Sequence, residues 1–190
     1  MIEFKIMYIE KYKENIKYTL LASALLLVLV FAISYYGNFR SEPYRFATIP
    51  DFELVTFSGE KHSMSEFLGK KHLIINFWAA WCSFCKEETL VLERLKRDFY
   101  DKDLEIIGIH RPHRESVEAG REFIEEIDVN YPVFLGGDEE EIYNFFTLGA
   151  DITPSSVLIT KNGDVHSIEF GWRTEEYFIE KIEEMIDVVE

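Results

Sequence analysis

The sequence predicts an α/β domain, in which helices flank a central mixed β-sheet, preceded by one transmembrane helix. Two observations predict the domain: continuous apolar runs typical of buried strands alternate with amphipathic helical patterns, and a late pair of strands surrounds the turn signal Asn162-Gly163. A third observation, a charge-free apolar stretch that begins at Thr19, predicts the membrane helix.

The composition is that of a folded protein with an acidic surface. Hydrophobic residues make up 47% of the 190 residues and aromatic residues 15%, which is enough for a packed core. The formal net charge is −15. Because phosphate backbones repel so anionic a surface, nucleic acid is not expected among the partners.

The apolar stretch TLLASALLLVLVFAIS contains no charged residue, and tyrosines stand at both of its edges. A helix of about 18 residues rises about 27 Å, close to the hydrocarbon thickness of a bilayer, and tyrosines are typical of the two interfaces. We therefore predict that residues 19–36 form a transmembrane signal-anchor helix in the lipid bilayer.

Basic residues are unevenly distributed around this helix. Four lysines precede it, whereas Arg40 and Arg45 are the basic residues that follow it closely. The positive-inside rule then places a short tail, residues 1–18, in the cytoplasm. A linker over residues 37–46 and a domain over residues 47–190 are expected on the extracytoplasmic side of the cytoplasmic membrane.

Two alternatives stay open for the apolar segment. It could be a cleaved signal peptide, with Ala32-Ile33-Ser34 as a weak cleavage site, or a helix buried in a soluble protein. The retained anchor is preferred over the signal peptide because the charged region and the apolar core are both long. It is preferred over the buried helix because every face of the segment is apolar.

The first two strands and the last two strands of the domain are each expected to form a hairpin. The first hairpin turns at Ser58-Gly59 and the last at Asn162-Gly163, a dipeptide typical of two-residue hairpin turns. Two apolar runs, Leu73–Trp78 and Leu104–Ile109, indicate strands buried on both faces. A short extended segment covers residues 129–135.

Amphipathic patterns predict the helices of the domain. A single helical turn ends at Gly69, and Thr174 is the expected cap of the last helix. The longer helices are expected over residues 83–99, 116–127, 138–146 and 174–189.

Cys82 and Cys85 are the only cysteines of the chain, and they lie where a buried strand ends and a helix begins. A helix N-terminus carries partial positive charge and free N–H groups, which favour a thiolate. Cys82, the better exposed of the two, would attack a disulfide, and the more shielded Cys85 would resolve the mixed disulfide. The pair thus predicts thiol–disulfide exchange.

Two cysteines so close together allow other uses. They could be buried residues without chemistry, since free cysteine packs as a small hydrophobe. Structural zinc needs four ligands, and no histidine stands at zinc-finger spacing. A copper site built from both cysteines and His110 or His166 stays open, although these histidines are more simply surface residues of a loop and a hairpin.

Glu88 shares the predicted buried face of its helix with Cys85. A carboxylate one turn from the inner thiol could accept and return the proton that this thiol must lose. The alternative is a glutamate that is stabilised by the helix dipole and reaches water. Both interpretations stay open from the sequence.

The stretches FWAAWCSFCKEE and ITPSSVLITKNGDV resemble the thioredoxin superfamily, and specifically its membrane-anchored TlpA/ResA-type thiol–disulfide oxidoreductases. The resemblance covers about Ile49 to Val189. It implies a thioredoxin-like fold, and the lead-in PDFELVTFSGEKHSMSEFLGKK resembles the extra N-terminal β-hairpin of these proteins.

The resemblance also implies roles for site residues. Cys82 matches the attacking cysteine and Cys85 the resolving one, Trp81 would flank them, and Glu88 matches an acidic residue near the inner cysteine. No cofactor beyond a redox-active Cys82–Cys85 disulfide is implied, and no metal.

The segment before the late hairpin matches a further part of the family site. Pro154 corresponds to a cis-proline beside the thiols, and Thr153 would offer backbone hydrogen bonds to a substrate chain. The alternative for Pro154 is an ordinary trans proline at a strand entry.

Two positions depart from the family pattern. The dipeptide between the cysteines is Ser83-Phe84, where a proline usually precedes the second cysteine, and Asn76 stands where cytosolic thioredoxins have a buried aspartate. Because that dipeptide helps to set the redox potential, the direction of the reaction is not inherited. The loop His110-Arg111-Pro112-His113 has no matching segment in the family pattern, and the resemblance gives it no role.

The expected protein is therefore a membrane-tethered extracytoplasmic oxidoreductase that exchanges disulfides with protein substrates. The resemblance favours a reductase, for example of the haem-attachment cysteines of apocytochrome c, supplied by a membrane electron donor or thiol–disulfide partner. The alternatives are a disulfide-introducing oxidant and a tethered copper-binding chaperone. A thiol peroxidase is disfavoured because no Pro-x-x-x-Thr-x-x-Cys pattern precedes either cysteine.

Overall fold

The computed structural model describes residues 16–21, 23–32, 49–112 and 115–189. The chain divides into two compact units, residues 1–42 and residues 43–190, each of which is described by itself.

In the first unit, residues 16–21 and 23–32 are helical. Their large apolar side chains are exposed, from 42% at Ile16 to 73% at Phe31. Within the described ranges, no helix combines the length and the apolar character needed to cross a membrane. The predicted tail, anchor and linker fall partly or wholly on residues 1–15, 22 and 33–48, outside the described residues, so their boundaries stay predictions.

The second unit is built on a mixed sheet with the strand order β2-β1-β5-β4-β3-β6-β7. β3 pairs in parallel with β4, and β4 in parallel with β5, whereas the other neighbouring strands pair antiparallel. The strands are β1 (Glu53–Thr56), β2 (Lys61–Ser63), β3 (His72–Trp78), β4 (Leu104–His110), β5 (Val133–Gly137), β6 (Ser155–Ile159) and β7 (Val165–Phe170).

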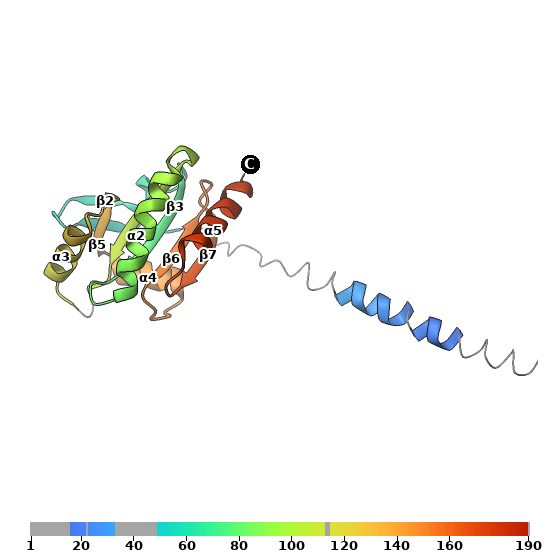
Figure 1. Cartoon of the computed structure of the whole chain (residues 1–190). Helices are drawn as coiled ribbons and strands as arrows, with labels where there is room; N and C mark the ends of the chain where they lie inside the picture. The colour runs from blue at the N-terminus through green and yellow to red at the C-terminus, as the bar shows by residue number, and fades with distance from the viewer. Residues whose placement is uncertain (1–15, 22, 33–48, 113–114, 190) are drawn as a thin grey trace, which may run out of the picture. The chain divides into compact units, whose positions relative to one another are not determined.

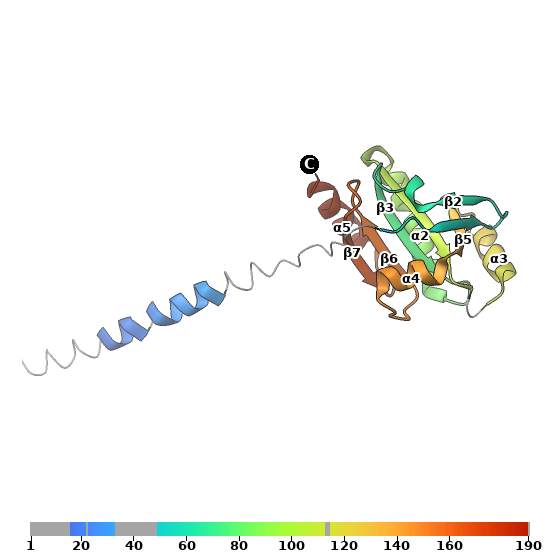
Figure 2. The ribbon, with the colours of Figure 1, turned by 180° about the vertical axis from the view of Figure 1, so that it is seen from behind.

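Helices cover both faces of this sheet, as the sequence predicts. α2 and α5 lie against one face (Figure 1), and α4 lies against the opposite face (Figure 2). α3 packs beside α2 through Phe123, which belongs to the same apolar cluster as Cys85. The helices are α2 (Ser83–Asp98), α3 (Val117–Ile127), α4 (Glu139–Thr147) and α5 (Glu175–Asp187).

β3 is buried at every position, which explains its continuous apolar run. Alternate side chains point to opposite faces of the sheet. Ile75 and Phe77 join the core under α4, whereas Ile74 joins the core under α2 and α5. The strand is therefore fixed from both sides, and so is the point at which it ends.

The turns and caps agree with the sequence signals. Gly59 and Gly163 have positive φ values of 88° and 87° in the two predicted hairpins, a conformation that glycine adopts without strain. Thr174 caps α5 by accepting a hydrogen bond from the backbone N–H of Tyr177. Both hairpins and all the longer helices predicted for the domain are confirmed, with shifts of one or two residues at their ends.

The pairing register brings three chain segments to one end of the sheet. Trp78, the last residue of β3, lies beside His110, the last residue of β4. Phe77 lies beside Ser155, where the antiparallel strand β6 begins. The segments after β3, after β4 and before β6 therefore meet at the N-terminus of α2.

Candidate active site

Cys82 and Cys85 lie at the start of α2. Cys82 is the N-cap residue, and its Sγ accepts a hydrogen bond from the backbone N–H of Cys85 at 3.2 Å. Both side chains are buried free thiols: 5% of Cys82 is exposed and 0% of Cys85. The order of exposure is the predicted one, and the N–H donor is of the kind that stabilises a thiolate at Cys82.

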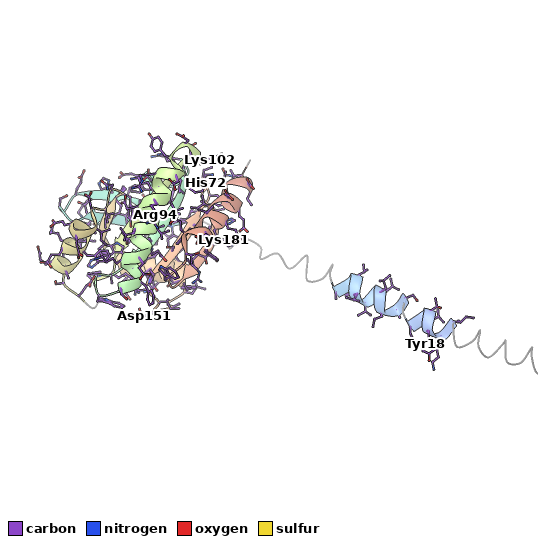
Figure 3. The ribbon with its side chains drawn as sticks, viewed as in Figure 1. Tyr18, His72, Arg94, Lys102, Asp151 and Lys181 are labelled. Atoms are coloured by element: carbon purple, nitrogen blue, oxygen red, sulfur yellow. The ribbon has the colours of Figure 1, made fainter. Side chains whose placement is uncertain are left out.

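The segment before β6 lies against these thiols. The Thr153–Pro154 peptide bond is cis, as predicted. The thiol of Cys82 donates to the carbonyl oxygen of Thr153 at 3.7 Å, so the two predicted halves of the site are in contact. Asp151, from the same segment, lies at the opposite end of the domain from Lys102, which follows α2 (Figure 3).

Large aromatic side chains surround the thiols at the surface. Trp81 is 50% exposed and Phe84 56% exposed, although each is next to a buried cysteine in the sequence. The rings of Phe84 and Trp172 lie 6.4 Å apart. Trp81 is thus an exposed neighbour of Cys82 along the chain, and its role beside the thiols stays a prediction.

Glu88 is buried in the interior of the domain, with 1% of its surface exposed. Its carboxylate accepts hydrogen bonds from Asn76 Nδ2 at 2.8 Å, Ser156 Oγ at 3.1 Å and the backbone N–H of Arg173 at 3.0 Å. Burial raises the pKa of Glu88 to about 7, although these three donors act in the opposite direction. The alternative in which this carboxylate reaches water is therefore wrong.

The pKa of Cys85 is also raised. Burial is the largest cause, followed by the hydrogen bond with Cys82, and the negative charge of Glu88 adds to the effect. A thiol and a carboxyl group thus face the same low-dielectric interior, and each disfavours ionisation of the other. The ionisation of Cys85 and that of Glu88 are therefore coupled, because a proton lost by either group makes it harder for the other to ionise.

The end of β4 and the segment after it contain site residues that the sequence did not reveal. His110 was predicted to be a surface residue, and this is wrong: it is fully buried. Its Nε2 atom lies 2.6 Å from Glu115 Oε1, and Glu115 accepts hydrogen bonds from the backbone N–H groups of Ala80 and Trp81 at 2.7 and 3.0 Å. Glu115 therefore fixes the backbone that leads into Cys82.

Close packing by α3 is the physical reason for the burial of His110. A Cβ on Gly120 of α3 would lie 2.7 Å from His110 Nε2, so this glycine provides the room for the imidazole ring. The sequence does contain a signal, because polar residues that follow two parallel strands gather at one edge of a sheet.

The structure does not favour the predicted copper alternative. Among the described residues, no group of three or more His, Cys, Asp and Glu side chains is arranged to hold a metal ion. His166 lies near the start of β7, whereas Phe170 at the end of β7 pairs with Ser155 beside the thiols. His166 is therefore at the far end of the sheet from the cysteines.

Comparison with known proteins identifies the family of the chain. Residues 47–168 match the AhpC/TSA family. The chain belongs to this family. It is 32% identical over 160 residues to the thiol-disulfide oxidoreductase ResA of Geobacillus kaustophilus, covering 81% of this chain and 88% of that one. It is 30% identical over 138 residues to the thioredoxin-like protein YneN of Bacillus subtilis, covering 70% and 76%.

Solved structures share the fold. A thiol:disulfide interchange protein from Chlorobium tepidum has a TM-score of 0.65 at 22% identity, covering 77% of this chain and 98% of that one. StoA from Bacillus subtilis has a TM-score of 0.57 at 21% identity, covering 70% and 96%. The fold is thus thioredoxin-like, and the chain is a thiol–disulfide oxidoreductase of the ResA type.

The raised pKa of Glu88 predicts a pH-dependent stability. The folded carboxyl keeps its proton up to about pH 7, whereas the ordinary pKa of glutamate is 4.5, so folding takes up a proton between these pH values. The free energy of unfolding should fall as pH rises through this window, by about 3 kcal/mol if the shift is fully expressed. Glu88→Gln should lose this dependence in urea titrations of the reduced protein at pH 4.5 to 8.

Glu87→Gln is the matched control, because Glu87 is an exposed neighbour on the same helix. It should keep the pH dependence of the wild type. An equal slope in Glu88→Gln and the wild type would contradict the assignment of the proton to Glu88.

Proposed function

We propose that the chain is a membrane-tethered extracytoplasmic reductase of protein disulfides, with Cys82 as the attacking thiol and Cys85 as the resolving thiol. The observation that carries the proposal is the contact between Cys82 Sγ and the carbonyl of Thr153, beside cis-Pro154, at the N-terminus of α2. A sulfur placed there meets both the free N–H groups of a helix and a backbone to which a substrate chain can bind.

The proposed reaction consists of two exchanges. The Cys82 thiolate attacks one sulfur of the substrate disulfide, whose S–S bond breaks, and the departing sulfur takes up a proton. The Cys85 thiolate then attacks Cys82 in the mixed disulfide, which forms the Cys82–Cys85 disulfide and releases the second substrate thiol. The substrate gains two electrons and two protons, and a dithiol partner must reduce the Cys82–Cys85 disulfide again.

Glu88 is the proposed acceptor of the proton that Cys85 releases. Its pKa of about 7 lies near ordinary working pH, which suits a group that both accepts and returns a proton. Asn76 and Ser156 hold its carboxylate by hydrogen bonds on the side of β3 and β6, one helical turn from Cys85.

The surface around the thiols supports a polypeptide substrate. Trp81, Phe84 and Trp172 expose aromatic rings beside a buried nucleophile, and such rings supply contact area at a low cost in conformational entropy. The backbone of Thr153 is the proposed partner of the substrate main chain. The haem-attachment cysteines of an apocytochrome c are one substrate of this class.

The direction of reduction follows the resemblance to the TlpA/ResA-type oxidoreductases. The stability of the outer thiolate sets the oxidising strength of such a couple, so the raised pKa of Cys85 does not decide the direction. A membrane dithiol or electron donor is the proposed source of electrons.

The exposed apolar side chains of residues 16–21 and 23–32 support the membrane anchor. Water is an unfavourable surrounding for a helix that exposes Leu25, Leu27 and Phe31 at 67%, 68% and 73%. The proposed anchor covers residues 19–36, with residues 1–18 in the cytoplasm and the thioredoxin-like domain outside.

The serine variants of the two cysteines should differ in activity. Cys82→Ser should abolish reduction of a protein disulfide, because the nucleophile is lost. Cys85→Ser makes the same replacement of sulfur by oxygen three residues further along the chain, so it serves as the matched control. It should still attack and should accumulate a mixed disulfide, visible on non-reducing gels. Normal turnover by Cys82→Ser would refute the proposal.

The reduction potential of the couple tests the direction. Thiol trapping of the soluble domain in defined redox buffers should give a value near or below about −250 mV, as in thioredoxin-type reductases. A value near about −120 mV would make the protein a disulfide-introducing oxidant instead.

Cell fractionation tests the anchor. The full chain, expressed in a bacterium, should stay with membranes after an alkaline wash, and protease added to spheroplasts should digest the domain. A chain that starts at residue 37 is the control and should be found in the soluble fraction. A processed, freely soluble product of the full chain would establish the cleaved signal peptide.

A further inference from the structure

Arg111, in the loop after β4, is a buried cation. Only 4% of its surface is exposed, so its guanidinium group needs partners in the protein. Nη1 donates to Thr153 Oγ1 at 2.9 Å and to Asp151 Oδ1 at 3.1 Å. Cζ lies 3.5 Å from the centroid of the Tyr143 ring, which adds a cation–π contact.

Tyr143 holds the same segment from α4. Its hydroxyl oxygen lies 2.6 Å from the carbonyl oxygens of Ala150 and Ile152, and it accepts the backbone N–H of Ile152 at 2.9 Å. Arg111 stacks on this ring and reaches past it to Thr153. The two side chains together fix residues 150–153 against the body of the domain.

The backbone of Arg111 is fixed to the other half of the site. Its N–H donates to the carbonyl of Trp78 at 2.8 Å, at the end of the strand that leads to the cysteines. One residue therefore bonds through its main chain to the segment before Cys82 and through its side chain to Thr153. The distance between the Cys82 sulfur and the Thr153 backbone therefore depends on Arg111.

We propose that Arg111 is a positioning residue that orients the Thr153 backbone for the main chain of a polypeptide substrate. The inference rests on the proposed function, because it assigns Thr153 to the substrate. The hydrogen bond to Thr153 is the important contact, since Thr153 directly precedes cis-Pro154, whereas Asp151 lies two residues earlier and its side chain is 54% exposed. Arg111 itself touches no reacting sulfur.

The test compares two substrates of the full chain in detergent. One is a peptide with a disulfide inside an extended chain, and the other is the small aromatic disulfide 5,5′-dithiobis(2-nitrobenzoate), which has no flanking main chain. Arg111→Met should lower kcat/KM for the peptide about tenfold, mainly through KM, as expected for a lost charge-assisted contact. The rate with the small disulfide should stay within a factor of about two of the wild type.

Arg121→Met is the matched control. Arg121 also contacts an aromatic ring, that of Phe57 at 5.7 Å, and donates to the carbonyl of Phe57 at 2.8 Å. It makes these contacts from α3, with Phe57 rather than with residues 150–153. Both substrates should react at wild-type rates.

Thr153→Val supplies a second, independent variant, because it removes the hydroxyl group and keeps the shape. It should lower kcat/KM for the peptide selectively, and the double variant Arg111→Met/Thr153→Val should be no worse than Arg111→Met alone. If Arg111→Met does not fold, as judged by circular dichroism, Thr153→Val decides the test by its selectivity.

The outcomes separate this inference from the proposed function. An Arg111→Met variant that reduces the peptide like the wild type, or that loses both substrates equally, overturns the inference while the proposed function stands. Additive losses in the double variant also overturn it. A wild type that reduces the small disulfide but not the peptide refutes the proposed function, and the inference with it.

Discussion

The carboxyl end of β3 determines the position of everything that acts in this domain. The strand is hydrogen-bonded to β4 on one edge and to β6 on the other, and both of its faces are covered by helices. Its last residues cannot shift without disturbing two strand pairings and two cores. Because α2 starts a few residues after β3, the end of this strand also fixes the position of Cys82. Because β6 runs antiparallel to β3, its first residue, Ser155, and the preceding Pro154 lie beside the end of β3.

The site combines a reactive sulfur with buried charges, and the charges have structural as well as chemical effects. The carboxylate of Glu115 holds the backbone N–H groups of Ala80 and Trp81, whereas that of Glu88 lies beneath Cys85. A buried carboxylate without donors would be strongly unfavourable. Backbone N–H groups donate some of the hydrogen bonds that both buried carboxylates need. The chain conformation around the thiols and the charge of these carboxylates therefore depend on each other.

Much of this arrangement could be predicted from the sequence, for reasons that are local. The apolar run of β3, the period of α2 and the spacing of Cys82 and Cys85 are short-range patterns, and Glu88 follows from the same helical period. His110 and Arg111 could not be predicted in this way. The burial of His110 depends on Gly120 of α3, and Arg111 meets Thr153, 42 residues away. Polarity after a strand normally indicates surface, and only tertiary packing reverses that expectation here.

The cap of α2 has a consequence for turnover. The sulfur that closes the first turn of this helix is the same sulfur that forms and breaks covalent bonds in the proposed cycle. Each catalytic event therefore changes the group that terminates the helix, from a thiolate acceptor to a disulfide sulfur and back. Val91, Leu92 and Leu95, further along the helix, are packed in the core with Ile74 of β3 and Phe178 of α5. We therefore expect the structural difference between the two redox states to be confined to the first turn of α2.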